Sequence, residues 1–495
     1  MVRMTDSKMT EAQPNYVDIS LPKKVRNRTP VIFIHGTKLI FVVIVLMTIL
    51  VGLYQSTGFG TRKPAFVSKF DVDMDIATLQ EMLHERAINR TVLISILDSG
   101  FLDMALNLWE TSYVRFNITN YLFICLSEKA WIELAIRNIS CFVYTKKFVV
   151  DSATFFGQIS YNKKVMLKTQ VSLQILMLGY NALTVDLDIV FFENPMPYMQ
   201  CGTCDLIITD NASKEVNSGF YLMKANKIGI AVQQKALQLA RGSLFAHDQL
   251  MLNTALTIFR ARKAIKMEVL DVHKFQPGKI YFEPADFASQ ANNTGIVLVH
   301  DNWIIGIENK IYRLKEMLLW EVDTDGYYSS ETTKYLTYKV PVNTTKYYAY
   351  KTHSFATQLA KALKRVVILP KFACKKDNST EIRECNFNSF FGHLPQESAV
   401  RESEFLNHHK VPESVKMSLS PVIHFDNSGH PSHFDTNSIL FKLGKEDNIN
   451  SLVQKLDSLG VSSYKVLQFG FLNDVAYQFQ SAPSFAKSHR SGRKS

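Results

Sequence analysis

The chain has 495 residues, of which 46% are hydrophobic and 20% are charged. It is too long for one ordinary domain, and its apolar content can bury one large core or two medium ones, so two globular units are expected. The formal net charge of +11 does not indicate a nucleic-acid partner, because part of the excess is local. It lies in a basic flank before an apolar run and in a basic C-terminal tail: Lys23, Lys24, Arg26 and Arg28, then Lys487, His489, Arg490, Arg493 and Lys494.

An uncharged apolar run from Leu39 to Tyr54 extends upstream to about the length that crosses a bilayer. A polar stretch precedes it, which favours a retained anchor over a cleaved signal peptide, and its lack of polar periodicity disfavours a buried core helix. Lys and Arg are concentrated before the run, so the N-terminus is expected in the cytosol and the remainder in a lumen. We expect a cytosolic tail at 1–30, a single-pass transmembrane signal anchor at 31–55 and a stem at 56–75.

Two features beyond the apolar run agree with an oxidising lumen. Acceptors for N-glycans of the form Asn-X-Ser/Thr occur at Asn89, Asn117, Asn138, Asn211, Asn292, Asn343 and Asn378. All the cysteines also lie there and form an even set, so disulfides are expected: Cys125, Cys141, Cys201, Cys204, Cys374 and Cys385. The sequence leaves their pairing open. For the Cys201-Gly-Thr-Cys204 motif, a structural disulfide is favoured over a redox or zinc site, because no second Cys/His pair stands nearby at zinc spacing.

Apolar strands alternate with amphipathic helices from Thr91 onwards, which predicts a parallel α/β sheet in a domain at 76–328. The pattern breaks around Asp323–Ser330, and a second, smaller α/β domain is expected at 329–480, before a basic tail at 481–495. The expected strands are 91–98, 121–127, 141–145, 181–192, 205–210, 219–224 and 295–300, and the expected helices are 102–114, 131–139, 161–178 and 228–241, with Gly179 capping the third of these helices.

The acidic pair Asp186 and Asp188 lies within the apolar segment 181–192. If this segment is a strand, side chains two residues apart project to the same side, so the two carboxylates can share one ion. Carboxylates buried without partner charges are costly, which favours a ligand role. Mn²⁺ or Mg²⁺ prefers such oxygen ligands and also binds diphosphate oxygens.

Another polar group follows the strand predicted at 295–300. His300 is a candidate third metal ligand, Asn302 and Gly306 suit close amide or backbone contact, and Lys310 can pair with phosphate.

Two further motifs carry candidate binding residues, each with a structural alternative. Asn217, Ser218 and Gly219 can present a polar amide to a sugar, although ordinary turn chemistry explains them equally well. Asp248 and Gln249 follow His247 at the start of a helical run, and a helical N-terminal cap is the alternative to a catalytic role.

Taken in order, these residues resemble the nucleotide-diphospho-sugar transferase domain of glycosyltransferase family 77 over about residues 90–320. The resemblance rests on Lys168, Gly179-Tyr180, Asp186-Leu187-Asp188 with FFENP, Asn217-Ser218-Gly219-Phe220, His247-Asp248-Gln249 with Leu252-Asn253, and His300 with Asn302, Gly306 and Lys310. It implies a GT-A-like, Rossmann-type α/β fold and a retaining, type II Golgi membrane enzyme. The implied donors are UDP-galactose, UDP-xylose and UDP-arabinofuranose, and the implied acceptor is a glycan or glycoprotein.

The resemblance also implies roles for single residues. Asp186 contacts ribose and metal, Asp188 and His300 bind the metal, and Lys310 holds the diphosphate. Asn217 and the pair Asp248 and Gln249 line the donor sugar near its anomeric carbon. A front-face displacement, with Asp248 or Gln249 stabilising an oxocarbenium-like state, follows as a hypothesis. Lys168, Ser218, Gly219, Asn302 and Gly306 complete the implied donor site.

Two alternatives to a transferase follow from the same sequence. A catalytically silent, membrane-anchored binding or scaffold protein can retain the fold, although the intact motif residues argue against it. A metal-dependent hydrolase would need more His and Asp ligands than the sequence offers. The segment FATQLAKALKRVVILPKFAC, Cys385 and Arg401–Leu406 together resemble a C-terminal module of some plant members, with packing or acceptor recognition as its implied role.

Overall fold

The computed structural model describes residues 74–144, 159–213, 215–241, 243, 245–282, 294–375, 382–393, 400–426, 438–444, 447–472 and 475–476. Residues Asp73–Ser495 form one compact unit, distinct from Met1–Val72. The predicted cytosolic tail, the anchor at 31–55, nearly all of the stem and the basic tail lie outside the described residues. Within the described part of the chain, no helix combines the length and the apolar character that a membrane span requires.

A seven-stranded sheet forms the first half of the compact unit, and its strand order is β3-β2-β1-β4-β7-β6-β8. Strands β3, β2, β1 and β4 are parallel, whereas β7 runs antiparallel to both of its neighbours. The central strands are apolar and buried almost throughout, as expected when helices cover both faces of a sheet. The bounds are β1 Thr91–Leu97, β2 Tyr121–Cys125, β3 Cys141–Val143, β4 Asn181–Val185, β6 Leu206–Asp210, β7 Val216–Met223 and β8 Met267–Leu270.

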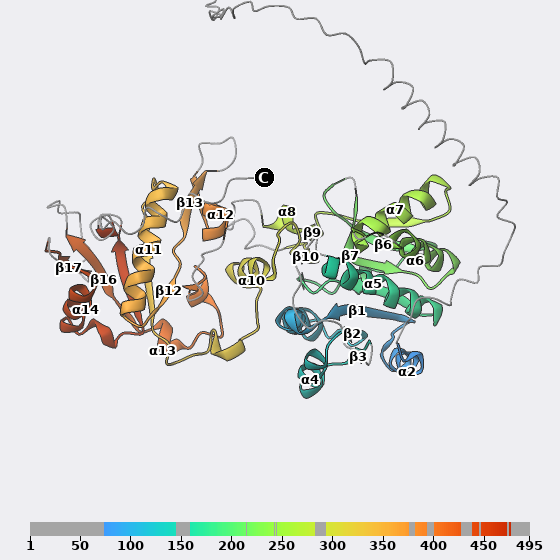
Figure 1. Cartoon of the computed structure of the whole chain (residues 1–495), viewed down its shortest axis with the longest axis horizontal. Coiled ribbons are helices and arrows are strands. Elements are labelled where there is room, and N and C mark those ends of the chain that lie inside the picture. Colours follow the sequence, from blue (N-terminus) through green and yellow to red (C-terminus); the bar gives the residue numbers. More distant parts are fainter. Residues whose placement is uncertain are drawn as a thin grey trace, which may run out of the picture. The chain divides into compact units, whose positions relative to one another are not determined.

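The helices of this half lie near the positions that the sequence predicts, except the first, which was not predicted. They are α2 Ile76–Arg86, α3 Leu102–Leu108 continued by a π-helical turn to Val114, α4 Glu128–Ile136, α5 Ile159–Met177, α6 Lys227–Ala240 and α7 Asp248–Ala261. Helices α5, α6 and α7 pack against one another (Figure 1). Side-chain caps begin several of them, as when Asn226 accepts hydrogen bonds from the backbone N–H groups of Ile228 and Gly229.

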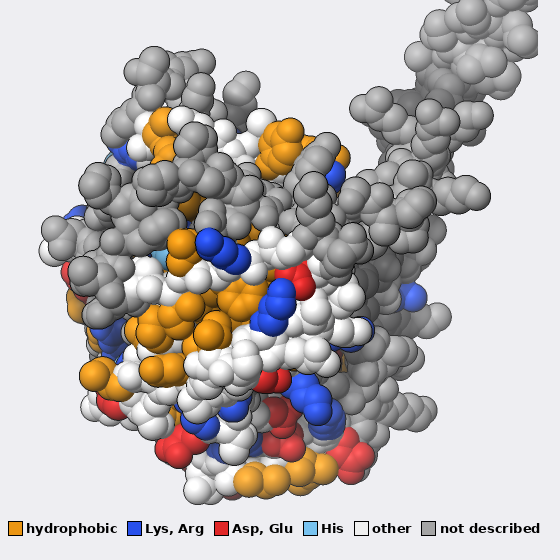
Figure 2. Space-filling view, turned by 90° about the vertical axis from the view of Figure 1, so that its left-hand side faces the viewer, with side chains coloured by type: hydrophobic (Ala, Val, Ile, Leu, Met, Phe, Trp, Pro, Cys, Tyr) orange, Lys and Arg blue, Asp and Glu red, His pale blue; other side chains and the backbone are white. Residues whose placement is uncertain are grey.

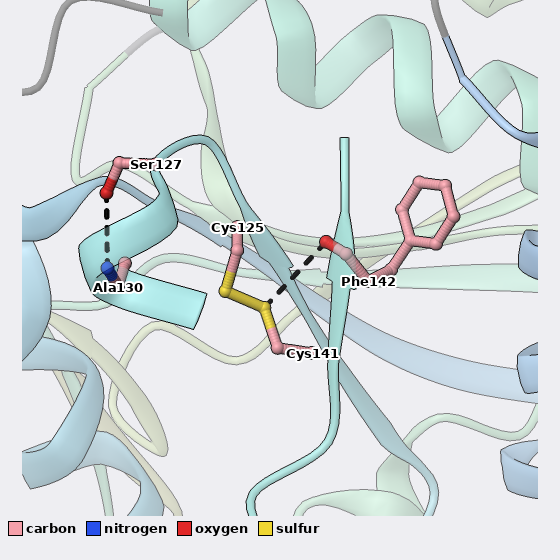
Figure 3. The surroundings of a disulfide bond; sticks show 5 residues. All are labelled: Cys125, Ser127, Ala130, Cys141 and Phe142. Carbon is pink, nitrogen blue, oxygen red and sulfur yellow. Dashed lines mark hydrogen bonds between the residues drawn. A yellow bond between two sulfur atoms is a disulfide. The ribbon is translucent and has the colours of Figure 1, made fainter. Parts of the chain in front are cut away.

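All six cysteines are paired, which confirms the predicted disulfides. Cys125–Cys141 joins the end of β2 to the start of β3, next to the cap in which Ser127 accepts a hydrogen bond from Ala130 (Figure 3). The other two bonds are Cys201–Cys204, within one loop, and Cys374–Cys385, across the hairpin of β13 Phe372–Lys375 and β14 Ile382–Cys385. The structural disulfide expected for the Cys-Gly-Thr-Cys motif is therefore present.

A small three-stranded sheet stands beside the first, with the order β5-β10-β9. Its strands are β5 Ile189–Phe191, β9 Phe275–Pro277 and β10 Leu298–His300. The single strand predicted at 181–192 is wrong, because β4 ends at Val185 and residues 186–188 form a turn that leads into β5. The turn carries the chain from one sheet to the other, and antiparallel pairing of β10 with β5 sets His300 opposite Ile189.

The second half contains a six-stranded, fully parallel sheet with the order β15-β12-β11-β18-β16-β17. Its strands are β11 Tyr335–Lys339, β12 Val366–Ile368, β15 Val400–Arg401, β16 Leu419–Asp426, β17 Ser438–Lys442 and β18 Val466–Phe471, and α11 Lys346–Ala362 and α14 Ile449–Ser458 pack against each other. The face in Figure 2 shows hydrophobic side chains gathered among charges of both signs.

The two halves of the compact unit share part of their core. Met104 and Val190 from the first half belong to one buried cluster with Tyr335, Phe405 and Val466 from the second. The predicted division into domains at 328/329 therefore stays a prediction, while the α/β character of both halves is observed.

One buried arginine joins three segments of the second half. The Arg365 guanidinium donates hydrogen bonds to the carbonyl oxygens of Tyr335, Ser462, Tyr464 and Lys465 at 2.9–3.1 Å. These carbonyls flank the starts of β11 and β18, so Arg365 ties adjacent strand ends together.

Replacing Arg365 with Met is expected to lower the free energy of unfolding by about 3 kcal/mol, because it removes charged donors and leaves carbonyl oxygens without partners. Urea unfolding followed by circular dichroism measures the change. The control is Lys361→Met, which alters an exposed lysine on the neighbouring α11. Equal unfolding curves for the two variants would contradict the assigned role.

Candidate active site

Two aspartates and one histidine converge where the two sheets of the first half meet. Nε2 of His300 lies 3.2 Å from Oδ1 of Asp188 and 3.9 Å from Oδ2 of Asp186. The three side chains each offer one ligand atom, and these atoms all lie within 4.8 Å of one another. Asp188 and His300 are buried, while the Asp186 side chain retains 30% of its exposure. Two carboxylate oxygens and an imidazole nitrogen suit a divalent cation.

A lysine occupies the second oxygen of each carboxylate. Lys168 Nζ donates to Oδ1 of Asp186 at 2.7 Å, and Lys310 Nζ donates to Oδ2 of Asp188. Each carboxylate therefore has one oxygen held by an ammonium and the other turned toward His300. This division leaves one oxygen from each aspartate for an ion.

The same charges shift the protonation equilibria of the site. Burial alone raises the pKa of Asp188, but Lys310 and His300 outweigh it and hold that pKa well below its usual range. Burial raises the pKa of Asp186, and Lys168 offsets only part of this effect. Burial lowers the pKa of Lys168, but Asp186 and Asp248 more than compensate and raise it well above its ordinary value. Asp188 and both lysines are charged at neutral pH, as a site for a cation and a phosphate requires.

Gly219 makes room for the histidine. A Cβ atom at Gly219 would collide with Cε1 of His300 and would lie only 2.8 Å from its Nδ1. The backbone N–H of Asp186 donates to the carbonyl oxygen of Gly219 at 2.7 Å, so β7 also fixes the start of the acidic turn. Gly219 thus helps to position the candidate metal ligands His300 and Asp186. Its predicted contact with the donor stays a prediction.

Asp248 and Gln249 sit against β7. Oδ2 of Asp248 accepts hydrogen bonds from Lys168 Nζ at 2.6 Å and from Ser218 Oγ at 3.0 Å. Both polar atoms of the Gln249 side-chain amide are hydrogen-bonded to the backbone of β7. Its oxygen accepts from the N–H of Ser218 and its nitrogen donates to the carbonyl of Val216, both at 2.6 Å. The cap of α7 is His247 and not either of these residues, so the alternative in which they only cap the helix is wrong.

Asn211 joins two of the predicted donor-binding amides, and the sequence interpretation missed it. Its Oδ1 accepts from Nδ2 of Asn217 at 2.9 Å and from Nδ2 of Asn302 at 3.2 Å. The residue was assigned as a glycan acceptor, but here its side chain lies inside the polar network. Its position directly after the strand that ends at Asp210 was the available signal, because polar residues at strand ends commonly line sites.

The segment from His300 to Lys310 is held by a second layer of contacts. Arg313 donates to Asp301 Oδ1 and, at 2.8 Å, to the carbonyl oxygen of Asn302. Gly306 adopts a φ of 96°, which favours glycine, directly before α10 Ile307–Glu316, and its carbonyl accepts from the N–H of Lys310. Gly306 therefore shapes the entry to the helix that carries Lys310. Its predicted contact with the donor stays a prediction.

A further ion pair lies one helical turn before Lys168 on α5. Lys164 pairs with Asp98, which follows β1 and is buried together with the lysine. Sequence reasoning did not single out either residue, although an aspartate at the end of a parallel strand is the usual signal.

Two other groups of potential ligands exist among the described residues, and neither suits an ion as well. In the first, Cys201 and Cys204 are joined in a disulfide. In the second, Glu321 is paired with Lys410, and both ring nitrogens of His408 are hydrogen-bonded to the backbone, at Trp320 and Lys410.

The matching family model is that of the nucleotide-diphospho-sugar transferases, over residues 117–314. A β-arabinofuranosyltransferase of Arabidopsis thaliana, RAY1, is 23% identical over 287 residues, which cover 53% of this chain and 53% of the relative. UDP-D-xylose:L-fucose α-1,3-D-xylosyltransferase 3 of the same plant is 27% identical over 199 residues, which cover 35% of this chain and 51% of the relative. The chain thus spans about half the length of these curated relatives.

Among solved structures, the glycosyltransferase GlyE of Streptococcus pneumoniae is similar over 75% of this chain and 99% of its own, at 11% identity and a TM-score of 0.30. A likeness this weak supports nothing further.

The predicted resemblance to glycosyltransferase family 77 is confirmed by the family match and the relatives, and the names of these relatives agree with the predicted enzyme class. The mixed α/β sheets and the family match also agree with the expected GT-A-like fold.

Gly219→Ala is expected to displace His300 and to weaken Mn²⁺ binding at least 10-fold, because the new methyl group overlaps the imidazole ring. Isothermal titration with MnCl₂ measures this change. The matched control is Gly202→Ala, since a Cβ at Gly202 meets nothing within 4 Å. Unaltered Mn²⁺ affinity in the Gly219 variant would show that His300 is not a ligand.

Proposed function

We propose that this chain, which carries a nucleotide-diphospho-sugar transferase domain over residues 117–314, transfers a sugar from a UDP-sugar to a glycan or glycoprotein acceptor in a metal-dependent, retaining reaction. One observation carries the proposal: Asp186, Asp188 and His300 turn one ligand atom each toward a common point, and Lys168 and Lys310 hold the remaining carboxylate oxygens.

Asp186, Asp188 and His300 would hold Mn²⁺ or Mg²⁺, which would supply positive charge to the leaving UDP. Lys310 lies beside Asp188 and has a raised pKa, so it keeps its charge and can move from the carboxylate to a diphosphate oxygen when the donor binds. Asp186, the most exposed of the three ligands, is the one that we assign to the ribose as well.

The sugar of the donor is assigned to the side of the site formed by Asp248 and Asn217. Both hydrogen bonds recorded for Asp248 use Oδ2, so we assign Oδ1 to stabilising the positive charge that develops at the anomeric carbon. The Gln249 amide binds the β7 backbone on both sides, and this favours Asp248 for the direct role and Gln249 for holding Ser218 in place. The reaction uses a front-face displacement without a covalent intermediate.

The donor belongs to the galactose, xylose or arabinose class. The name of one relative, a xylosyltransferase, supports a xylosyl donor, and that of another, an arabinofuranosyltransferase, supports an arabinofuranosyl donor. The first of these names also supports L-fucose as an acceptor sugar.

A catalytically silent scaffold with the same fold is the alternative function. It is disfavoured because taking carboxylates and lysines out of water costs free energy even when they pair, and binding of a metal and a diphosphate gives these buried charges a role that a scaffold lacks.

The full chain with Mn²⁺ is expected to release UDP from at least one of UDP-xylose, UDP-galactose and UDP-arabinofuranose, with transfer of the sugar to an acceptor or to water. The acceptors to be tried are methyl α-L-fucoside, methyl β-D-galactoside and methyl α-L-arabinofuranoside. Removal of the metal with EDTA abolishes turnover and MnCl₂ restores it. Asp188→Asn reduces turnover at least 100-fold, because it removes a charged metal ligand.

The control for this experiment is Glu85→Gln, which alters an exposed carboxylate on α2. UDP release, measured for each donor, provides the readout. If no donor is consumed, or if the Asp188 variant turns over as fast as the wild type, the scaffold becomes the better description.

We further propose that the chain is a single-pass type II protein of the Golgi membrane with its catalytic half in the lumen. Asn89, Asn117, Asn138 and Asn343 are exposed, which suits N-glycan acceptors. The first three precede β1, β2 and β3, at the edge of the sheet opposite to Asp186 after β4, so glycans there leave the site open.

Expression in a secretory host is expected to yield N-glycans on these four asparagines and none on Asn211, whose side chain binds within the site. Peptide mass spectrometry after endoglycosidase treatment locates the glycans. Asn89→Gln removes one glycan and leaves activity intact, whereas Asn211→Gln lowers activity without a change in glycan mass. A glycan on Asn211 would contradict its position in the network, and an absence of glycans everywhere would contradict lumenal topology.

A further inference from the structure

Trp303 combines exposure to solvent with an unusual backbone conformation. It is 50% exposed, and its φ of 62° lies in the left-handed region. A single exposed aromatic residue needs no explanation. A bulky side chain at positive φ, however, is strained and persists only where the surrounding structure enforces it, often at a functional site.

The contacts that fix the backbone at Trp303 are made by the side chain and the carbonyl group of the preceding residue, Asn302. Asn302 Oδ1 accepts a hydrogen bond from the N–H of Gly278 at 2.7 Å, and the carbonyl of Asn302 accepts one from Arg313 at 2.8 Å. The Asn302 side chain also donates to Asn211. The backbone that presents Trp303 is therefore fixed by the same network that holds the predicted donor-binding amides.

The position of Trp303 in the chain relates it to the candidate metal site. It lies between His300, whose Nε2 faces the two aspartates, and Lys310, which pairs with Asp188. Lys279, an exposed residue of α8 Gly278–Tyr281, places its ammonium 5.3 Å from the centroid of the indole ring. A half-exposed indole ring with an ammonium group over one of its faces thus directly follows Asn302, which belongs to the hydrogen-bonded network that includes the amides assigned to the donor.

We propose that Trp303 is the platform on which one sugar ring of the acceptor glycan stacks, with Lys279 placed to donate to a hydroxyl group of that sugar. This inference rests on the proposed function. Sugar rings carry one face of C–H groups, which pack against the apolar face of an aromatic ring, while their hydroxyl groups take hydrogen bonds at the rim. The strain at Trp303 is then the cost of presenting a large, rigid ring to solvent beside the reacting groups.

The test compares acceptor and donor kinetics of the full chain in detergent, with methyl α-L-fucoside as acceptor probe and UDP-xylose as donor. Trp303→Ala is expected to raise the KM for the fucoside at least 10-fold and to change the KM for UDP-xylose less than twofold. Trp303→Phe, which keeps an aromatic face, stays within about threefold of the wild type for both. The matched control is Trp131→Ala, which removes another exposed tryptophan, on α4, at an ordinary helical position.

A third variant separates binding from folding. Asn tolerates the left-handed region better than other non-glycine residues, so Trp303→Asn is expected to melt at or above the wild-type temperature while losing fucoside affinity as the Ala variant does. A purely structural tryptophan would instead give a lower melting temperature and no selective change in KM.

The outcomes distinguish this inference from the proposed function. If the wild type transfers xylose and Trp303→Ala has an unchanged KM for the fucoside, the platform is refuted and the transferase stands. An equal rise in both KM values also refutes it, because the ring then shapes the donor site. If the wild type consumes no UDP-sugar, the proposed function fails, and the inference falls with it.

Discussion

The balance of buried charge at the end of β4 is the constraint on which the site depends. Carboxylates with little access to water are costly unless cations neutralise them. Asp186 and Asp248 share Lys168, and Asp188 takes Lys310. Each lysine thereby fixes the orientation of the carboxylates it binds, and the second oxygens of Asp186 and Asp188 face His300. The arrangement that solves the problem of burial is thus also the one that prepares a place for a cation and an anionic donor.

The architecture brings these groups together from distant parts of the chain. The parallel strands β1 and β4 end at the same edge of the seven-stranded sheet, while β10 reaches that edge from the small sheet beside it. The turn at 186–188 links the two sheets, so its aspartates stand between them. A single strand through this segment would have kept the aspartates in one sheet, away from the histidine that β10 supplies.

Helix α10 connects the site to the second half of the compact unit. Lys310 near its start pairs with Asp188, and Glu316 at its end accepts hydrogen bonds from the Ser403 hydroxyl and N–H. Lys410 of the second half also pairs with Glu110 of the first, at 2.8 Å. The second half therefore supports the helix that carries a lysine of the site, which gives it a part in the geometry of the site whatever else it binds.

The sequence by itself determined most strands and helices and the even set of cysteines, because hydrophobic periodicity and residue chemistry are local properties. It also singled out most of the residues that the structure brings together around Asp186 and Asp188. It could not determine which oxygen of Asp188 faces His300, that a side chain at Gly219 would collide with His300, or that the Asn211 oxygen accepts hydrogen bonds from two other amides. Those facts depend on contacts between residues far apart in the chain. The strain at Trp303 was likewise invisible, because nothing in its neighbouring residues fixes a φ of 62° and only the contacts of Asn302 with Gly278 and Arg313 impose it.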